Sequence, residues 1–208
     1  GQVVAAAGID QTISFGVLPG VTYGDLPLSL NATATSGLAV TYSSSNTSVV
    51  TVSGTTLTIV GVGSASITAS QSGDATYNPA PDVVRGIIVS PKSLTVSNAA
   101  ASDKVFNNSS AAVITGTLSG VVGSDDVALN GAGTFADLNV ANGIAVTAAC
   151  TLTGTTAGNY TLIQPTGLTA NITAANATIT FNAIPTYSTA NTTFTLNATA
   201  SSGAAVSY

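Results

Sequence analysis

Apolar and polar residues alternate along most of the chain, in short segments separated by turn residues. Residues 28–34, with the sequence LSLNATA, place Leu and Ala on one side and Ser, Asn and Thr on the other, as in a half-buried strand. Such segments recur about every ten residues, and no interval of that length has helical periodicity. The predicted fold class is therefore all-β, built from antiparallel β-sandwiches. Strands are predicted at residues 11–15, 28–34, 39–42, 65–70, 83–90, 93–97, 111–120, 126–137, 143–154, 159–164 and 168–173, and a hairpin about Ser53–Gly54 is predicted at residues 49–60.

The C-terminal part of the chain repeats its N-terminal part. When the sequence is shifted by 166 positions without a gap, residues 177–208 overlie residues 11–42, and 14 of the 32 pairs are identical. A fixed period of this kind indicates an array of repeated structural modules. The predicted organisation is the end of a preceding repeat or linker at 1–10, one sandwich at 11–90, a different sandwich at 91–174, and the first strands of an incomplete further copy at 175–208.

Charged residues are scarce, and this limits the partners that the chain can have. They make up 5% of the chain and leave a net charge of −5, whereas soluble domains usually contain about 25%. Ser and Thr, 57 of the 208 residues, are expected to replace them on the surface. The three basic residues, Arg85, Lys92 and Lys104, are too few to neutralise a run of phosphates, so nucleic acid is not an expected partner. No stretch approaches the roughly 20 apolar residues that span a bilayer, so membrane insertion is not expected. Because the sequence begins at Gly1, the chain is interpreted as an internal piece of a longer protein.

Few side chains are suited to catalysis. The chain has no His, and its one thiol, Cys150, lies in an apolar alternation between Ile144 and Leu152, which predicts a buried hydrophobic side chain rather than a reactive one. A Ser nucleophile would need a base, and only Lys92 and Lys104 could serve, without the Ser-x-x-Lys spacing. We predict no enzymatic activity, no catalytic residues, no cofactor and no bound metal.

Two groups of acids are candidate calcium ligands, because calcium takes six to eight oxygens from loop carboxylates and carbonyls. Asp125 and Asp126 with Asp137 form the first group, but the alternative, an ordinary polar turn, is favoured because no Asp-x-Asp-x-Asp-Gly spacing is present. The second group would stiffen the linkers between sandwiches, although nothing in the sequence pairs its members. It consists of Asp10, Asp82 and Asp103.

Four tyrosines could stack on sugar rings, because a phenol has an apolar face and a polar edge. They are Tyr23, Tyr42, Tyr77 and Tyr160. A chain with only eleven Phe and Tyr residues needs them for its core and for hydrogen bonds at turns, and this interpretation is favoured. Tyr160, at the start of a predicted strand, is expected to hold a turn.

Two stretches of the chain resemble known repeat families. Residues 11–90 resemble a bacterial Ig-like repeat through LSLNATATSGLAVTY, VVTVSG, TIVGVGSASITASQ and GDATYNPA. Residues 92–174 resemble the YDG repeat through GTLSGVVGSDDVAL, GTFADLNVANGIAVT and AGNYTLIQPTGLTANIT, although Phe106–Asn107–Asn108 stands at the namesake Tyr-Asp-Gly position. The resemblance implies tandem Ig-like antiparallel β-sandwiches in an elongated array.

The alternation of these repeats is similar to the repeat regions of giant Bacteroidota surface adhesins, the SprB-like gliding-motility adhesins exported by the type IX secretion pathway. This resemblance implies a cell-surface or secreted location and a semi-rigid stalk that serves surface attachment or gliding motility. The implied partners are neighbouring repeats of the same chain, and extracellular polysaccharide or surface proteins. The alternative function is a module that binds glycan or protein through its sandwich loops.

Overall fold

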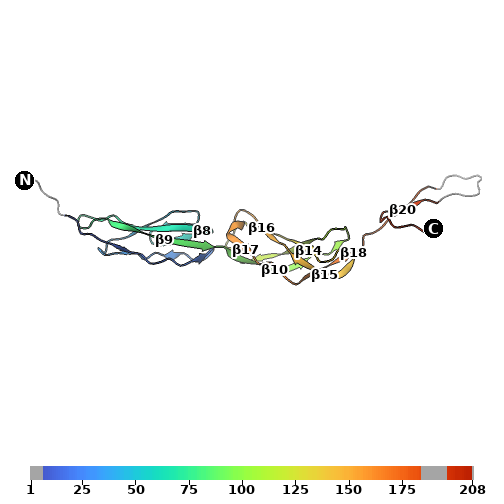
Figure 1. Cartoon of the computed structure of the whole chain (residues 1–208), viewed down its shortest axis with the longest axis horizontal. Helices are drawn as coiled ribbons and strands as arrows, with labels where there is room; N and C mark the ends of the chain where they lie inside the picture. The colour runs from blue at the N-terminus through green and yellow to red at the C-terminus, as the bar shows by residue number, and fades with distance from the viewer. Residues whose placement is uncertain (1–6, 184–195, 208) are drawn as a thin grey trace, which may run out of the picture.

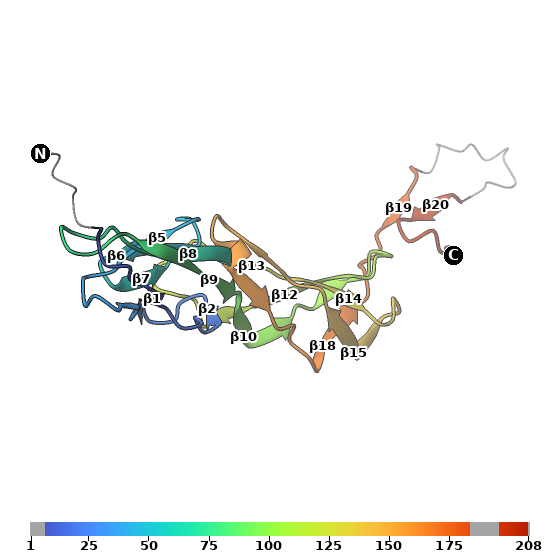
Figure 2. The same ribbon diagram turned by 60° about the vertical axis from the view of Figure 1, so that its left-hand side comes forward.

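The computed structural model describes residues 7–183 and 196–207 and is drawn in Figure 1. Parts of the predicted segments 1–10 and 175–208 therefore lie outside the described residues. Where the chain is described, its regular structure is β-strand apart from one 3-10 turn at Ala157–Asn159. The chain is elongated, with a first lobe (residues 7–90) and a second lobe (residues 92–173) end to end, followed by a hairpin (Figures 1 and 2). The prediction of an all-β fold is confirmed.

The first lobe packs two main sheets around one apolar core. One sheet has the order β2-β9-β8-β5 and the other the order β3-β7-β6, while β1 pairs with β4. Alternate residues of the long strand β8 point into the core, where Ile67 is fully buried. The strands are β1 (Ile13–Ser14), β2 (Val21–Thr22), β3 (Leu28–Ser29), β4 (Thr33–Ala34), β5 (Thr41–Ser44), β6 (Val50–Ser53), β7 (Thr56–Ile59), β8 (Gly63–Gln71) and β9 (Ala80–Ser90).

The single strand predicted at residues 28–34 is divided in the structure. Its beginning, β3, pairs with β7, whereas its end, β4, pairs with β1. The segment therefore crosses between two ladders, which alternation of side chains alone does not reveal. The hairpin predicted at residues 49–60 is confirmed as β6 and β7, with Gly54 at a φ of 58° in the turn.

The second lobe has one large sheet of order β11-β18-β15-β14-β12-β10-β17 and a smaller pair, β13 with β16. Its own apolar core includes Ile114, Phe135 and Ile172, which are almost fully buried. The strands are β10 (Lys92–Ala101), β11 (Lys104–Val105), β12 (Ala111–Ser119), β13 (Ala128–Asn130), β14 (Ala132–Phe135), β15 (Ala141–Ala148), β16 (Thr151–Thr153), β17 (Tyr160–Leu162) and β18 (Leu168–Thr173).

Both lobes contain parallel pairings, and here the prediction of purely antiparallel sheets is wrong. In the first lobe β2 runs parallel to β9, and in the second β10 runs parallel to β17 and β11 to β18. The partners are 68 positions apart in both lobes, as in the side-chain contact of Ser93 with Thr161. Ile9 pairs with Tyr77 in the first lobe, and Lys92 pairs with Tyr160 in the second. The same parallel pairing thus recurs after 83 residues. The sequence comparison found only the longer repeat, because the two lobes share backbone pairing far more than residue identity.

The C-terminal hairpin repeats the pairing of the first two-stranded ladder. Its strands are β19 (Ile179–Phe181) and β20 (Ala198–Ala200). Ile179 pairs with Ala200 just as Ile13 pairs with Ala34, so the register agrees with the 166-residue repeat. The two equivalent isoleucines differ in burial: Ile13 is 8% exposed, whereas Ile179 is 64% exposed. No helix among the described residues is long and apolar enough to cross a membrane.

Candidate functional site

The two lobes are joined through β9 and β10, and each of these strands has a parallel partner in its own lobe. β9 ends at Ser90 and β10 begins at Lys92, so only Pro91 separates them. On the first-lobe side β2 runs beside β9, and on the second-lobe side β17 runs beside β10. Tyr23, which follows β2, and Tyr160, which begins β17, therefore approach one another from different lobes.

The turn after β2 orients Tyr23. The Thr22 backbone N–H donates to the Asp25 carboxylate at 2.8 Å, and the Asp25 N–H donates to the Thr22 carbonyl at 3.0 Å. Gly24 adopts a φ of 85°, a conformation that favours glycine. A Cβ atom at Gly24 would lie only 2.5 Å from a methyl group of Val122, so the lack of a side chain lets the second lobe approach.

One carboxylate of the second lobe receives hydroxyl groups from both lobes. The Tyr23 hydroxyl donates to Asp125 Oδ2 at 2.9 Å, and the Tyr160 hydroxyl donates to the same oxygen at 2.5 Å. The Val122 N–H donates to the Tyr160 hydroxyl oxygen at 3.0 Å. The two rings meet edge to face, with centroids 5.4 Å apart and an interplanar angle of 86°. We call Tyr23, Asp125 and Tyr160 the junction cluster.

Apolar packing surrounds the junction cluster. Val89, Leu94 and both tyrosines of the cluster are buried in one continuous apolar core, so the core of the first lobe extends into the second. A further hydrogen bond crosses the boundary where the Val62 N–H donates to Asn159 Oδ1 at 3.0 Å. The second lobe adds half-buried side chains to this core at Leu118, Val121, Val122, Val127, Leu152 and Leu162.

Burial changes the acid–base properties of both phenols. Burial, together with the hydrogen bond to Asp125, raises the pKa of Tyr160 to about 12. The same two causes raise the pKa of Tyr23. Both hydroxyls are therefore protonated donors at neutral pH, which is the state that the Asp125 carboxylate requires.

The three acids of the first candidate calcium group have different hydrogen-bond partners in the structure. Asp125 accepts the two tyrosine hydroxyls, whereas Asp126 accepts the N–H and the hydroxyl of Thr155, each at 2.9 Å, which lowers the pKa of Asp126. Asp137 accepts the N–H and side-chain amide of Asn139. Within the described ranges no three acids, Cys or His residues lie close enough together to hold a metal ion.

The acids predicted near the linkers are also apart from one another. Asp10 accepts a hydrogen bond from the Asn78 side chain at 2.7 Å. Asp103 accepts the N–H and side chain of Asn171, and these bonds lower the pKa of Asp103. Asp82 is an exposed residue of β9. Asp10 and Asp103 thus each bond a residue 68 positions further along the chain.

The tyrosines serve mainly the core and the turns. The Tyr42 hydroxyl accepts the Ala32 N–H at 2.7 Å, and its ring lies 5.6 Å from that of Phe15. The prediction that Tyr160 holds a turn is confirmed by its bonds to Val122 and Asp125. Tyr77 is half-buried.

Cys150 is buried, as predicted, with 5% of its surface exposed. Its backbone N–H and carbonyl form two 2.8 Å hydrogen bonds with the side chain of Gln164. Its Sγ lies 3.6 Å from the Ala132 carbonyl oxygen.

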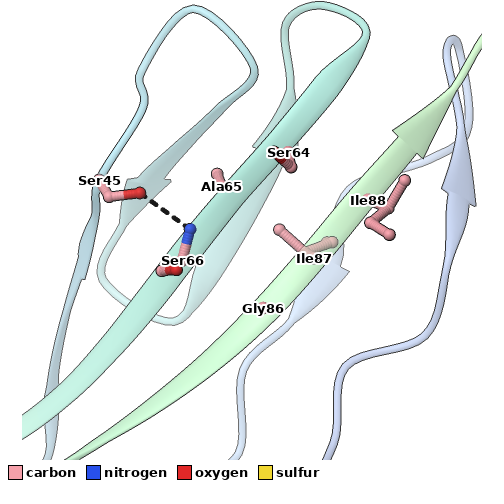
Figure 3. A pocket seen from close by; sticks show the side chains of 7 residues that line it. All are labelled: Ser45, Ser64, Ala65, Ser66, Gly86, Ile87 and Ile88. Carbon is pink, nitrogen blue, oxygen red and sulfur yellow. Dashed lines mark hydrogen bonds between the residues drawn. The ribbon is translucent and has the colours of Figure 1, made fainter.

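A hollow on the first lobe has a different character from the junction. It measures about 430 Å³ and lies over β5, β8 and β9, where Ser45 accepts the Ser66 N–H at 2.9 Å (Figure 3). Gly86 contributes no side chain to it. Its lining contains neither a charged nor an aromatic side chain: Ser45, Ser64, Ala65, Ser66, Gly86, Ile87 and Ile88.

Comparison with known proteins bears on the second lobe. No curated protein matches the chain. Residues 90–170 match the YDG domain, in agreement with the resemblance seen in the motifs of that stretch. The chain contains a YDG domain at residues 90–170.

Proposed function

We propose that this chain is a structural segment of a long cell-surface adhesin and serves as a semi-rigid stalk in surface attachment or gliding motility. The supporting observation is the junction, where the apolar core of the first lobe extends into the second and tyrosines of both lobes bond one carboxylate. A stalk must keep its direction from one module to the next. Buried contacts at the boundary restrict bending, whereas a polar linker without contacts would permit it.

The remaining parts of the proposal rest on composition and resemblance. The protein is placed at the cell surface, attached to the outer membrane or secreted, with neighbouring repeats of the same chain as its first partners. Extracellular polysaccharide or surface proteins are the proposed targets of the adhesin as a whole. The proposal gives the chain no catalytic step, cofactor or metal.

The stiffness of the junction can be tested with pairs of spin labels in the full chain. Labels at Ser72 and Asn139, both exposed and in different lobes, report the distance across the junction. Labels at Ser53 and Ser72, both in the first lobe, form the matched control, and Cys150→Ala removes the native thiol from both samples. We expect distance distributions of similar width, and a much broader distribution across the junction would contradict a semi-rigid stalk.

The proposed location needs a separate experiment. Antibodies against residues 7–173 should label intact cells of the organism that produces the protein, without permeabilisation. Labelling that requires permeabilised cells would contradict the proposal. Saturable binding of a polysaccharide that loop substitutions abolish would instead support the alternative, a binding module.

A further inference from the structure

We propose that each lobe contains a parallel strand clamp that resists tension along the long axis, and that the junction cluster couples the two clamps. This deepens the proposed function, on which its biological meaning rests. The first clamp is residues 9–22 beside residues 77–90. The second clamp is residues 92–105 beside residues 160–173. In each, the segment that enters the lobe runs parallel to the segment that leaves it.

The first clamp is bonded at both of its ends. At the beginning, the Ile9 N–H donates to the Thr76 carbonyl and the Asn78 N–H donates to the Ile9 carbonyl, both at 2.9 Å. At the other end β2 pairs with β9, and the Tyr23 N–H donates to the Ser90 carbonyl at 2.9 Å. The backbone of the entering segment is thus bonded to the leaving segment at both ends of the lobe.

Side chains hold the part of the first clamp between these ends, where β1 pairs with β4. The Arg85 guanidinium donates from Nε to the Phe15 carbonyl at 2.8 Å. The Gln11 side chain donates to the Asn78 carbonyl at 2.7 Å. Arg85 therefore has a structural role in a chain with only three basic residues.

The second clamp repeats this arrangement. β10 pairs with β17 at its beginning, where the Ile163 N–H donates to the Leu94 carbonyl at 2.9 Å. β11 pairs with β18 at its end, where the Phe106 N–H donates to the Thr173 carbonyl at 2.8 Å. Phe106 occupies the place that Tyr23 occupies in the first lobe, 83 residues earlier.

The direction of pulling determines how these bonds carry force. Tension on the chain pulls the entering segment toward the N-terminal end and the leaving segment toward the C-terminal end. The two parallel segments must then slide past each other, so their evenly spaced bonds share the force. Force applied at one end of a ladder instead breaks its bonds one after another.

The junction cluster links the two clamps at the ends that face each other. Tyr23 follows the clamp strand β2, and Tyr160 begins the clamp strand β17. Sliding of β2 along β9 must separate Tyr23 from Asp125 and from the Tyr160 ring. Opening of one clamp is therefore resisted by contacts with the other lobe.

Single-molecule force spectroscopy of the full chain tests the clamps. In one sample the chain is held at its two ends, and in the other at its N-terminal end and at Ser72→Cys, which lies at the N-terminal end of the first clamp. Both carry Cys150→Ala. End-to-end pulling should unfold the first lobe at a force higher by about a factor of two or more, because forced unfolding follows the unfolding barrier. Equal forces in the two directions would overturn the clamp.

The coupling is tested by Asp125→Ala, which removes the shared acceptor, with Asp125→Asn as the conservative variant that keeps a side-chain oxygen. Asp137→Ala is the matched control, because Asp137 is bonded only to Asn139 in an exposed turn. We expect Asp125→Ala to lower the unfolding force and to separate the unfolding of the two lobes, whereas Asp125→Asn restores part of the loss and Asp137→Ala behaves as the native chain. Circular dichroism of each variant verifies that it is folded before pulling. A folded Asp125→Ala chain with native forces would overturn the coupling.

These results are independent of the proposed location. If the cells are labelled at their surface but the two pulling directions unfold the lobe at equal force, the clamp fails and the stalk remains. If the clamp is found but labelling requires permeabilised cells, the proposed function fails and the mechanical property remains.

Discussion

Asp125 and Asp126 are neighbours in a polar turn, yet they have unrelated roles. Asp125 bonds Tyr23, which lies in the other lobe, and Tyr160. Asp126 bonds the backbone and hydroxyl of Thr155. The partners come from distant parts of the chain, so the local sequence could indicate a polar turn but not the division of roles within it.

Alkaline pH is expected to loosen the junction through Tyr160. The pKa of this phenol is about 12 in the fold, compared with an ordinary value of 10.0. Because folding raises the pKa, the stabilisation is complete below pH 10 and is lost as the pH rises through 12. Phenolate absorbance measured against pH should show a late step that is smaller in Tyr160→Phe than in the native chain, because Tyr23, whose pKa is also raised, remains. An unchanged late step in Tyr160→Phe would contradict the assignment.

Gly24→Ala is expected to destabilise the chain more than Gly37→Ala. Both glycines have positive φ, 85° and 76°, so both substitutions cost roughly 1–2 kcal/mol of backbone strain. A new Cβ at Gly24 also meets Val122, whereas nothing lies within 4 Å of one at Gly37. This overpacking adds about 1 kcal/mol or more for Gly24→Ala. Urea denaturation of both variants measures the difference in the free energy of unfolding. Equal losses of unfolding free energy would show that Val122 can move to accommodate the new methyl group.

The two antiparallel pairs with the same register, β1 with β4 and β19 with β20, should differ in stability. A two-stranded hairpin alone is marginally stable in water, whereas burial against further strands stabilises it. Ile13 of β1 belongs to the buried core of the first lobe, but Ile179 of β19 is 64% exposed. Amide hydrogen exchange should therefore be much faster in β19 and β20 than in β1 and β4. Comparable protection in the two pairs would mean that other contacts cover β19 and β20.

Strand prediction succeeded where burial alternates over several residues. The predicted strand at 168–173 coincides with β18, in which Leu168, Ala170 and Ile172 are buried. The short strands β2 and β11 were missed, because two residues carry no periodic signal. Both are parallel partners of strands 68 positions away, and such long-range pairing has no local sequence signature.

Removal of calcium should leave the stability and shape of the molecule unchanged. Asp10, Asp103, Asp126 and Asp137 each have at least one carboxylate oxygen bonded to a protein donor, and Asp125 accepts the Tyr23 hydroxyl at the junction. Thermal unfolding and small-angle X-ray scattering with and without a chelator should therefore agree. A lower melting temperature, or a shorter maximum dimension, after chelation would show that the oxygens bind an ion instead.

The all-β class, the turns, the buried thiol and the 166-residue repeat follow from the order of residues along the chain. Each depends on alternation, turn chemistry or identity at a fixed spacing, which are local or periodic properties. The junction cluster and the two clamps depend on contacts across 35 to 102 positions. They form only when the packing of both lobes brings these residues together, because the half-buried Asp125 carboxylate accepts hydrogen bonds from donors that lie far away in the sequence. The sequence shows the side-chain types of Tyr23, Asp125 and Tyr160, but only the folded structure brings the three residues together.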